Sequence, residues 1–196
     1  MEILKTLVVD DELGMRLSVQ KALTRFSMTL PDVEETIGFE VDVAGTGEEA
    51  IEKIEANRPD LLLLDYKLPG MSGLDILDRI TSEESEMVTL MITAYASIDI
   101  AITAIKRGAF DFIAKPFTPD ELKKTVSKAA QSLILARRVR RLEQERKQVR
   151  FQFIRVLGHE LKAPLNAVEG YLVQMQEHLL GGELAPYDPM VNRSLL

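Results

Sequence analysis

Cysteine is absent from this chain of 196 residues, and tryptophan is absent as well. Without cysteine, the chain can form neither a disulfide framework nor a metal site with thiolate ligands. No apolar run approaches the roughly 18 residues that a membrane-spanning helix needs. The first residues, Met1–Lys5, lack the pattern of a signal peptide. We therefore expect a cytoplasmic protein without a membrane span.

Basic residues are scarce in the first two thirds of the chain. Residues 1–130 contain 14 Lys and Arg against 24 Asp and Glu, whereas residues 131–196 contain 10 against 7. Four arginines of the second part stand close together: Arg137, Arg138, Arg140 and Arg141. Such a cluster can mark a nucleic-acid-binding patch. No helix-turn-helix pattern accompanies it, so we favour the solvated face of a helix and expect no nucleic-acid partner.

Hydrophobic residues make up 46% of the chain, and in the first half they gather in short runs that alternate with amphipathic segments. We expect strands near 5–9, 39–44, 61–65, 88–92 and 110–114, and helices near 13–27, 47–57, 73–82 and 97–107. This alternation predicts an α/β fold, a doubly wound parallel sheet of five strands with helices on both faces. Residues 27–38 look like an insertion, which we expect to be an extended helix or a loop.

Polar side chains follow the apolar runs directly: Asp10, Asp11, Asp65, Thr93 and Lys115. Because ligands of open α/β sheets bind outside the carboxyl ends of the strands, these side chains should surround one crevice. Three carboxylates suit a hard divalent cation, and an ammonium and a hydroxyl beside it can bind a phosphoryl group. Each motif alone has a simpler explanation as a helix cap or a turn. Their joint order favours a phosphoryl-transfer site.

These motifs resemble the receiver domain of bacterial response regulators over about residues 3 to 130. The motifs that carry the resemblance are Asp10-Asp11, Asp65–Gly73, Ile92–Ala94 and Lys115–Phe117. The resemblance implies a flavodoxin-like fold and two-component phosphorelay signalling. It also implies an upstream phosphodonor, either a kinase or a phosphotransfer protein.

The resemblance assigns roles toward the phosphoryl group by position. Asp65 would be the phospho-acceptor, and Thr93 and Lys115 would contact the phosphoryl group. Phe112 would be a switch residue that changes rotamer on phosphorylation. The Lys115–Pro116 peptide bond is expected to be cis.

The resemblance also implies a metal site for Mg²⁺ or Mn²⁺. Its ligands would be Asp10, Asp11, Asp65 and the backbone carbonyl of Lys67, with Asp10 acting mainly through water. A haloacid-dehalogenase-type phosphatase would also use an aspartyl nucleophile. That family carries a second Asp two residues later, where this chain has Lys67.

A long helix should follow the fifth strand, because almost no helix breaker occurs between Pro119 and Pro164. Apolar residues recur there at spacings of four, three, seven, four and three: Leu135, Val139, Leu142, Val149, Phe153 and Val156. Arg146 stands at the skipped position of this heptad pattern. We therefore expect a long coiled coil and a homodimer that forms through residues 135–180.

A second motif, His159–Leu165, resembles the H-box of sensor histidine kinases. By position, His159 would be a second phospho-acceptor and Glu160 would orient its ring and accept its proton. Pro164 would bend the helix. The resemblance implies a helical hairpin for dimerisation, whose first helix ends near Leu179–Gly182 and whose second begins at Asp188.

We therefore expect three parts: a receiver domain at 1–130, a coiled-coil linker at 131–152, and a histidine-phosphotransfer dimerisation region at 153–196 that is truncated early in its second helix. The parent protein would be an ATP-dependent protein-histidine kinase. This chain alone should be inactive as a kinase, because ATP would act only through a domain that it lacks. The receiver would regulate the phosphotransfer helix, and a downstream receiver would take the phosphate. The alternative is a non-enzymatic receiver adaptor whose coiled coil docks a partner protein.

Overall fold

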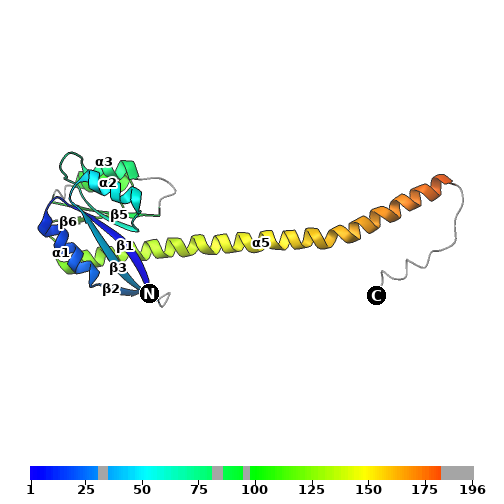
Figure 1. The fold of residues 1–196 in the computed structure, drawn as a ribbon, viewed down its shortest axis with the longest axis horizontal. Coiled ribbons are helices and arrows are strands. Elements are labelled where there is room, and N and C mark those ends of the chain that lie inside the picture. The colour runs from blue at the N-terminus through cyan, green and yellow to red at the C-terminus, as the bar shows by residue number, and fades with distance from the viewer. Residues whose placement is uncertain (31–34, 81–85, 95–97, 182–196) are drawn as a thin grey trace. The chain divides into compact units, whose positions relative to one another are not determined.

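The computed structural model describes residues 1–30, 35–80, 86–94 and 98–181. They belong to two compact units, Met1–Arg140 and Arg141–Leu196. Figure 1 labels the elements, which are β1 (Glu2–Val9), α1 (Leu13–Thr24), β2 (Ser27–Leu30), β3 (Glu35–Ala44), α2 (Gly47–Ala56), β4 (Leu61–Asp65), α3 (Gly73–Ile80), β5 (Val88–Thr93), α4 (Ile98–Lys106), β6 (Asp111–Ala114) and α5 (Pro119–Gly181). The domain boundaries expected at 130/131 and 152/153 stay predictions.

A single sheet forms the centre of the first unit, with the strand order β2-β3-β1-β4-β5-β6. All neighbouring strands are parallel except β2 and β3, which are antiparallel. The predicted doubly wound parallel sheet is therefore confirmed in its main part. The predicted number of five strands is wrong, because β2 adds a sixth strand at one edge.

The additional strand lies in the segment that was expected to be an extended helix or a loop. Its residues Ser27–Leu30 alternate polar and apolar side chains, which is the pattern of a strand with one buried face. Leu30 is buried and Met28 packs against the core. The ring of Phe26 stacks on that of Phe39 with centroids 5.7 Å apart, so α1 ends at Thr24 and the chain turns back along β3.

Helices cover both faces of the sheet, as their apolar contacts show (Figure 1). In β4, Leu61 and Leu63 face the core shared with α1 and α5, whereas Leu62 and Leu64 face the core shared with α2, α3 and α4. This follows from the alternation of side chains along a strand. A strand buried on both faces explains why β4 reads as an unbroken run of leucines.

The start of α5 is held by a capping box. The backbone N–H of Glu121 donates to Thr118 Oγ1 at 3.2 Å, and the N–H of Thr118 donates to Glu121 Oε2 at 2.8 Å. The helix therefore begins at a defined residue just beyond β6. Thr46 caps α2 in a related way, accepting from the N–H of Glu49 at 3.2 Å.

Helix α5 packs on the first unit through residues that share one face: Leu122, Val126, Ala129, Ala130, Leu133 and Ile134. Arg137, one turn beyond Leu133, binds three carboxylates. It forms an ion pair with Asp60, which precedes β4, and others with Glu2 at 3.4 Å and Glu86 at 3.2 Å. Placing the whole arginine cluster on a solvated helix face was therefore wrong for Arg137. The packing of α5 on the first unit brings Arg137 to acids that are distant in the sequence.

The second unit consists, in its described part, of the remainder of α5. Every side chain from Arg141 to Gln176 is exposed, and Pro164 lies inside the helix. The description of α5 stops at Gly181. The expected end of a first helix near Leu179–Gly182 therefore stays a prediction. Asp188, the expected start of a second helix, lies outside the described residues, and the coiled coil is not confirmed. No helix of the described residues is long and apolar enough to cross a membrane.

Candidate functional site

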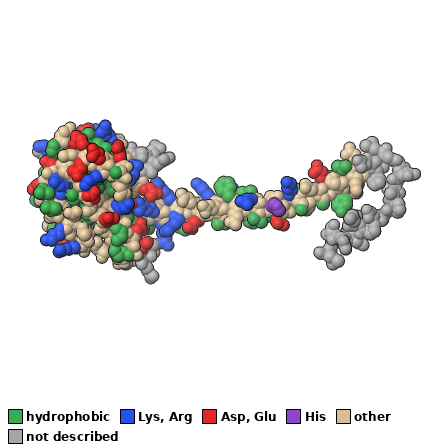
Figure 2. All heavy atoms as spheres, in the orientation of Figure 1, with side chains coloured by type: hydrophobic (Ala, Val, Ile, Leu, Met, Phe, Trp, Pro, Cys, Tyr) green, Lys and Arg blue, Asp and Glu red, His purple; other side chains and the backbone are tan. Residues whose placement is uncertain are grey.

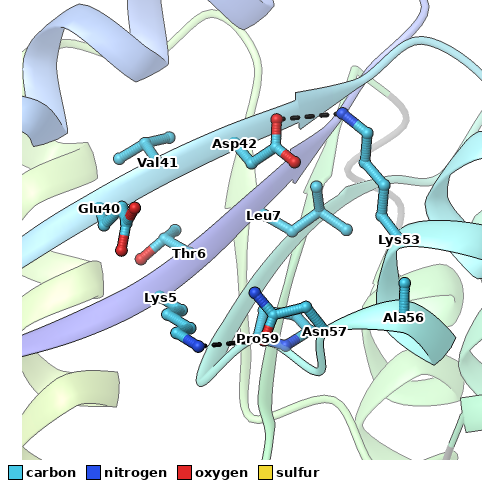
Figure 3. A pocket seen from close by; sticks show the side chains of 10 residues that line it. All are labelled: Lys5, Thr6, Leu7, Glu40, Val41, Asp42, Lys53, Ala56, Asn57 and Pro59. Carbon is cyan, nitrogen blue, oxygen red and sulfur yellow. Dashed lines mark hydrogen bonds and ion pairs between the residues drawn. The ribbon is translucent and has the colours of Figure 1, made fainter.

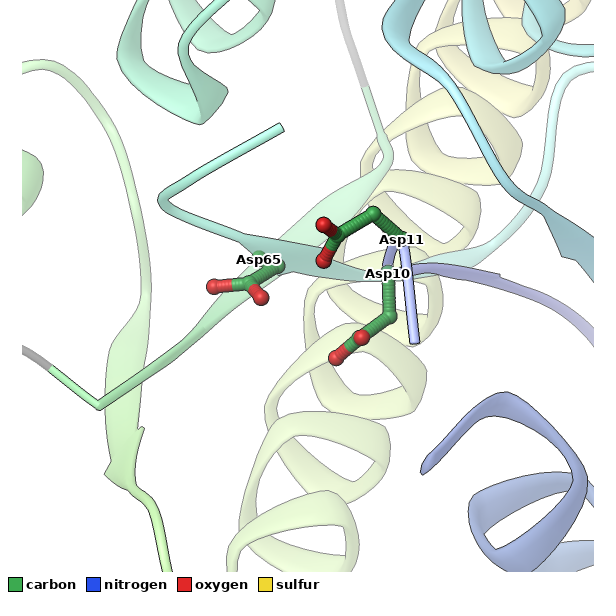
Figure 4. A group of neighbouring side chains, drawn as sticks. All are labelled: Asp10, Asp11 and Asp65. Atoms are coloured by element: carbon green, nitrogen blue, oxygen red, sulfur yellow. The ribbon is translucent and has the colours of Figure 1, made fainter. Parts of the chain in front are cut away.

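The polar side chains predicted to share a crevice come from the carboxyl ends of four strands. Asp65 and Thr93 are the last residues of β4 and β5, while Asp10 follows β1 and Lys115 follows β6. Because these strands are parallel and adjacent in the order β1-β4-β5-β6, their ends meet at one edge of the sheet. Figure 4 shows Asp10, Asp11 and Asp65 gathered at the ends of β1 and β4.

Lys115 joins two of these acids directly. Its Nζ lies 2.6 Å from Asp10 Oδ2 and 2.7 Å from Asp65 Oδ2. Asp10 is fully buried and Asp65 is 5% exposed. The backbone N–H of Lys115 also donates to the carbonyl of Thr93 at 2.8 Å, which holds the lysine at the end of β5. The peptide bond from Lys115 to Pro116 is cis.

Burial and hydrogen bonding have opposite effects on the pKa values of Asp65 and Lys115. Burial raises the pKa of the Asp65 carboxyl above its ordinary value, and the hydrogen bond from Lys115 opposes that rise. Burial alone would lower the pKa of the Lys115 ammonium, but its hydrogen bonds to Asp10 and Asp65 outweigh burial and raise this pKa. The lysine therefore stays charged and favours the ionised, nucleophilic form of Asp65.

Backbone contacts orient both carboxylates. The N–H of Glu12 donates to Asp10 Oδ1 at 2.9 Å, and the N–H of Lys67 donates to Asp65 Oδ1 at 3.3 Å. The guanidinium of Arg16 donates to the carbonyl of Asp10 at 2.5 Å. The sequence analysis did not single out Arg16. Its position in the first turns of α1 does not show that its side chain reaches back to Asp10.

Gly73 is a second residue that the sequence reasoning did not assign to the site. A Cβ at this position would lie 2.2 Å from the backbone oxygen of Asp65, closer than any side chain can approach. The N–H of Gly73 donates to the carbonyl of Tyr66 at 2.8 Å. Glycine therefore lets α3 begin directly against the strand end that carries Asp65. Its place in the Asp65–Gly73 motif was the signal for such a close contact.

The three carboxylates suit a divalent cation. Oxygen atoms of Asp10, Asp11 and Asp65 all lie within 4.8 Å of one another, and Asp11 is exposed while the other two are buried. Oxygen ligands in such an open group fit Mg²⁺, which keeps several waters when it binds to proteins. The backbone carbonyl of Lys67 stays a predicted further ligand.

A separate hollow lies between β1, β3 and the end of α2. Its volume is about 470 Å³, and Figure 3 shows the lysines at its rim bound to neighbours. Lys53 pairs with Asp42 at 3.0 Å, and Lys5 donates to Asn57 Oδ1 at 3.0 Å. None of the predicted site residues lines it. It therefore takes no part in the site.

The remaining predicted residues do not join this cluster in the described structure. Phe112 lies in β6 and is 38% exposed. His159 and Glu160 lie exposed on α5 in the second unit. Their roles stay predictions.

The geometry of the first unit agrees with a family match. Residues 6–127, more than half of the chain, match the response regulator receiver domain. This chain belongs to the response regulator receiver family. Receiver domains carry a phosphorylatable aspartate in two-component signalling, bind Mg²⁺ at an acidic pocket and take phosphate from a kinase or phosphotransfer partner. Those coarser predictions are confirmed.

The receiver is similar to regulatory proteins of several bacteria. It is 39% identical over 93 residues to the luminescence regulatory protein LuxO of Vibrio campbellii, covering 47% of this chain and 20% of LuxO. It is 37% identical over 140 residues to the nitrogen assimilation regulatory protein NtrX of Azorhizobium caulinodans, covering 70% of this chain and 28% of NtrX. The chain therefore spans a fifth to a little over a quarter of the length of these relatives.

The fold is that of a solved CheY-like receiver domain protein from Methanospirillum hungatei. The two structures agree with a TM-score of 0.59 at 28% identity, covering 69% of this chain and 99% of the other.

The expectation of a histidine-kinase parent is wrong. The relatives LuxO and NtrX are response regulators rather than kinases. The receiver match ends at residue 127, so it gives no support to the H-box resemblance of His159–Leu165. The chain is a response regulator receiver with a long C-terminal helix.

Proposed function

We propose that this chain is a phosphorylation-controlled module in which Asp65 accepts the phosphoryl group and α5 carries the resulting change toward the C-terminal segment. The observation that carries this proposal is the contact of Lys115 Nζ with both Asp10 and Asp65, at 2.6 and 2.7 Å. A cation held between two carboxylates at a strand end is placed to meet the charge of an incoming phosphoryl group. The exposed Asp11 leaves the site open on one side.

The chemistry follows from these positions. An oxygen of Asp65 forms a bond to phosphorus while the bond from phosphorus to the donor breaks, and the donor keeps that electron pair. Lys115 donates to a phosphoryl oxygen and offsets its charge, as does the hydroxyl of Thr93. A Mg²⁺ held by Asp10, Asp11, Asp65 and the carbonyl of Lys67 would supply positive charge at the same oxygens.

The output would pass through β6 and α5. When Thr93 moves toward the phosphoryl group, the half-exposed ring of Phe112 changes rotamer and alters the face beside α5. Arg137 ties α5 to Asp60, directly before β4, whose other end is Asp65. One strand, β4, thus links the acceptor Asp65 to the ion pair that holds α5.

We propose that the module acts through the exposed part of α5. Two copies of the chain would dimerise there, through residues 135–180. A receiver adaptor whose helix docks a partner is compatible with the same surface. Phosphotransfer at His159, with Glu160 orienting its ring and a downstream receiver as acceptor, depends on the H-box resemblance alone.

The experiment is phosphorylation of the chain by acetyl phosphate with Mg²⁺, followed by intact mass spectrometry. Wild type should gain one phosphoryl group, and Asp65→Asn should gain none. Asp120→Asn is the matched control, because Asp120 is an exposed aspartate outside the cluster. An adduct that persists in Asp65→Asn would overturn the assignment.

A further inference from the structure

We infer that the exposed apolar seam of α5 binds a second copy of this chain, with the two helices parallel and in register. This inference deepens the proposed dimerisation by naming its orientation and its determinants. It does not depend on phosphorylation of Asp65, so the two proposals can fail separately.

The seam begins on the side of α5 that points away from the receiver. Leu133 is buried against the sheet and Arg137 binds its acids. Leu135 lies two positions after Leu133, and Val139 lies two positions after Arg137. At about 100° per residue, each is turned by about 200° around the helix from that residue. Both are exposed, at 40% and 56%. A second helix can therefore reach the seam without displacing the receiver's own packing.

The seam continues along the helix as a stripe of large apolar side chains. Leu142, Val149, Phe153 and Val156 are all more than half exposed in the single chain. Figure 2 shows hydrophobic side chains at the surface along this helix. A heptad stripe of this kind, unlike scattered apolar residues, is buried when two such helices pack side by side.

Charges beside the seam identify the partner. Val139 and Phe153 occupy the a positions of the heptad and Leu142 and Val149 the d positions. The preceding g positions are Arg138 and Glu145, and the e positions are Glu143 and Arg150. In a parallel pair, each g residue faces the e residue of the next heptad on the partner. Arg138 then faces the partner's Glu143, and Glu145 faces the partner's Arg150, twice in a symmetric dimer.

These four charges have no ion-pair partner within the described part of their own chain. By contrast, Arg137 and Arg140, on the side toward the receiver, are both paired with its acids. The helix thus separates paired charges on one side from unpaired, complementary charges flanking the seam. A second copy of this chain carries the matching set.

Arg146 sets the register. It occupies the a position between Val139 and Phe153, in the middle of the seam. In register, Arg146 faces its own counterpart and lies next to the partner's Glu145 at g. A shift by one heptad would set this charge against an apolar side chain, which is costly. A single polar a residue is a known determinant of register.

A charge-exchange experiment on the full chain tests the pairing. One variant, Glu143→Arg with Glu145→Arg, carries only positive charges at these e and g positions. The other, Arg138→Glu with Arg150→Glu, carries only negative ones. In sedimentation, each alone should dimerise about a hundredfold more weakly than wild type. Mixed, they should restore a 1:1 dimer. Variants that dimerise as wild type does would overturn the charge pairing, and a monomeric wild type would overturn the dimer itself.

The absence of cysteine allows a second test of orientation. In a parallel, in-register dimer, Leu142→Cys places two thiols across the core, so mild oxidation should give a disulfide-linked dimer. Gln144→Cys, at the outward f position, is the matched control and should not cross-link. Circular dichroism and the urea unfolding midpoint report that each variant keeps a folded receiver. A folded Leu142→Cys chain that cross-links no better than Gln144→Cys would overturn the parallel, in-register arrangement.

Discussion

Lys115 and Asp65 form an ion pair of 2.7 Å although 50 residues separate them in the chain. Their strands, β6 and β4, are not neighbours, because β5 lies between them in the sheet. The lysine therefore reaches across the end of β5 to contact the acid, and the site exists only when these strands have assembled in this order.

Removal of this lysine should destabilise the receiver. In Lys115→Met, Asp10 and Asp65 would stay buried without their cation, so the free energy of unfolding at neutral pH should fall by about 3 kcal/mol. The exposed Lys124 provides a control, because Lys124→Met leaves the site unchanged. Urea unfolding of both variants measures the difference.

The same variant should show a defined pH dependence. The hydrogen bond from Lys115 lowers the pKa of Asp65, so its loss lets burial raise that pKa further. The folded state then binds a proton that the unfolded state releases, and stability falls as pH rises above the ordinary pKa of an aspartate. Lys115→Met should therefore lose more stability at pH 8 than at pH 5. An equal loss at both values would contradict this origin.

Gly73→Ala should damage the receiver more than an ordinary glycine substitution. Its Cβ would lie 2.2 Å from the backbone oxygen of Asp65, so α3 or the end of β4 must move. We expect a loss of about 3 kcal/mol and slower phosphorylation. Gly14→Ala is the matched control, since no atom lies within 4 Å of its added Cβ. It should be neutral or stabilising by up to about 1 kcal/mol.

Arg137→Ala should loosen the end of the receiver-bound part of α5. Removing the guanidinium leaves Asp60 without its ion pair and should cost about 1 to 3 kcal/mol. Hydrogen exchange should become faster for the amides just beyond Leu133. Arg141→Ala, an exposed neighbour, should change neither quantity. Unchanged exchange in Arg137→Ala would mean that the apolar contacts alone hold the helix.

Mg²⁺ should stabilise the wild-type chain by an amount that depends on Asp11. At a concentration a hundredfold above its Kd, a ligand of the folded state adds about 2.7 kcal/mol. Asp11→Ala should fold normally, because Asp11 is exposed, but its Tm should respond much less to Mg²⁺. Chelation with EDTA should reverse the effect in wild type. Equal Tm shifts in both chains would place the cation elsewhere.

The sequence by itself determined the core of this protein. The unbroken leucines of β4 indicate a strand buried on both faces. The polar residues that follow four such runs are then expected to meet at one edge of a parallel sheet. The apolar pattern of α5 could also be predicted, because which residues share one face of a helix depends only on the geometry of the helix itself.

Only the tertiary structure decided which distant groups meet. Strand β2 forms because Phe26 stacks on Phe39 and Leu30 is buried, and a four-residue alternation is too short to show this alone. The packing of α5 brings Arg137 to Asp60, although 77 residues separate the two in the chain. Glycine is required at position 73 because the backbone oxygen of Asp65 lies too close to leave room for a Cβ. Periodicity is a local property of the chain, whereas these contacts depend on how the elements pack in space.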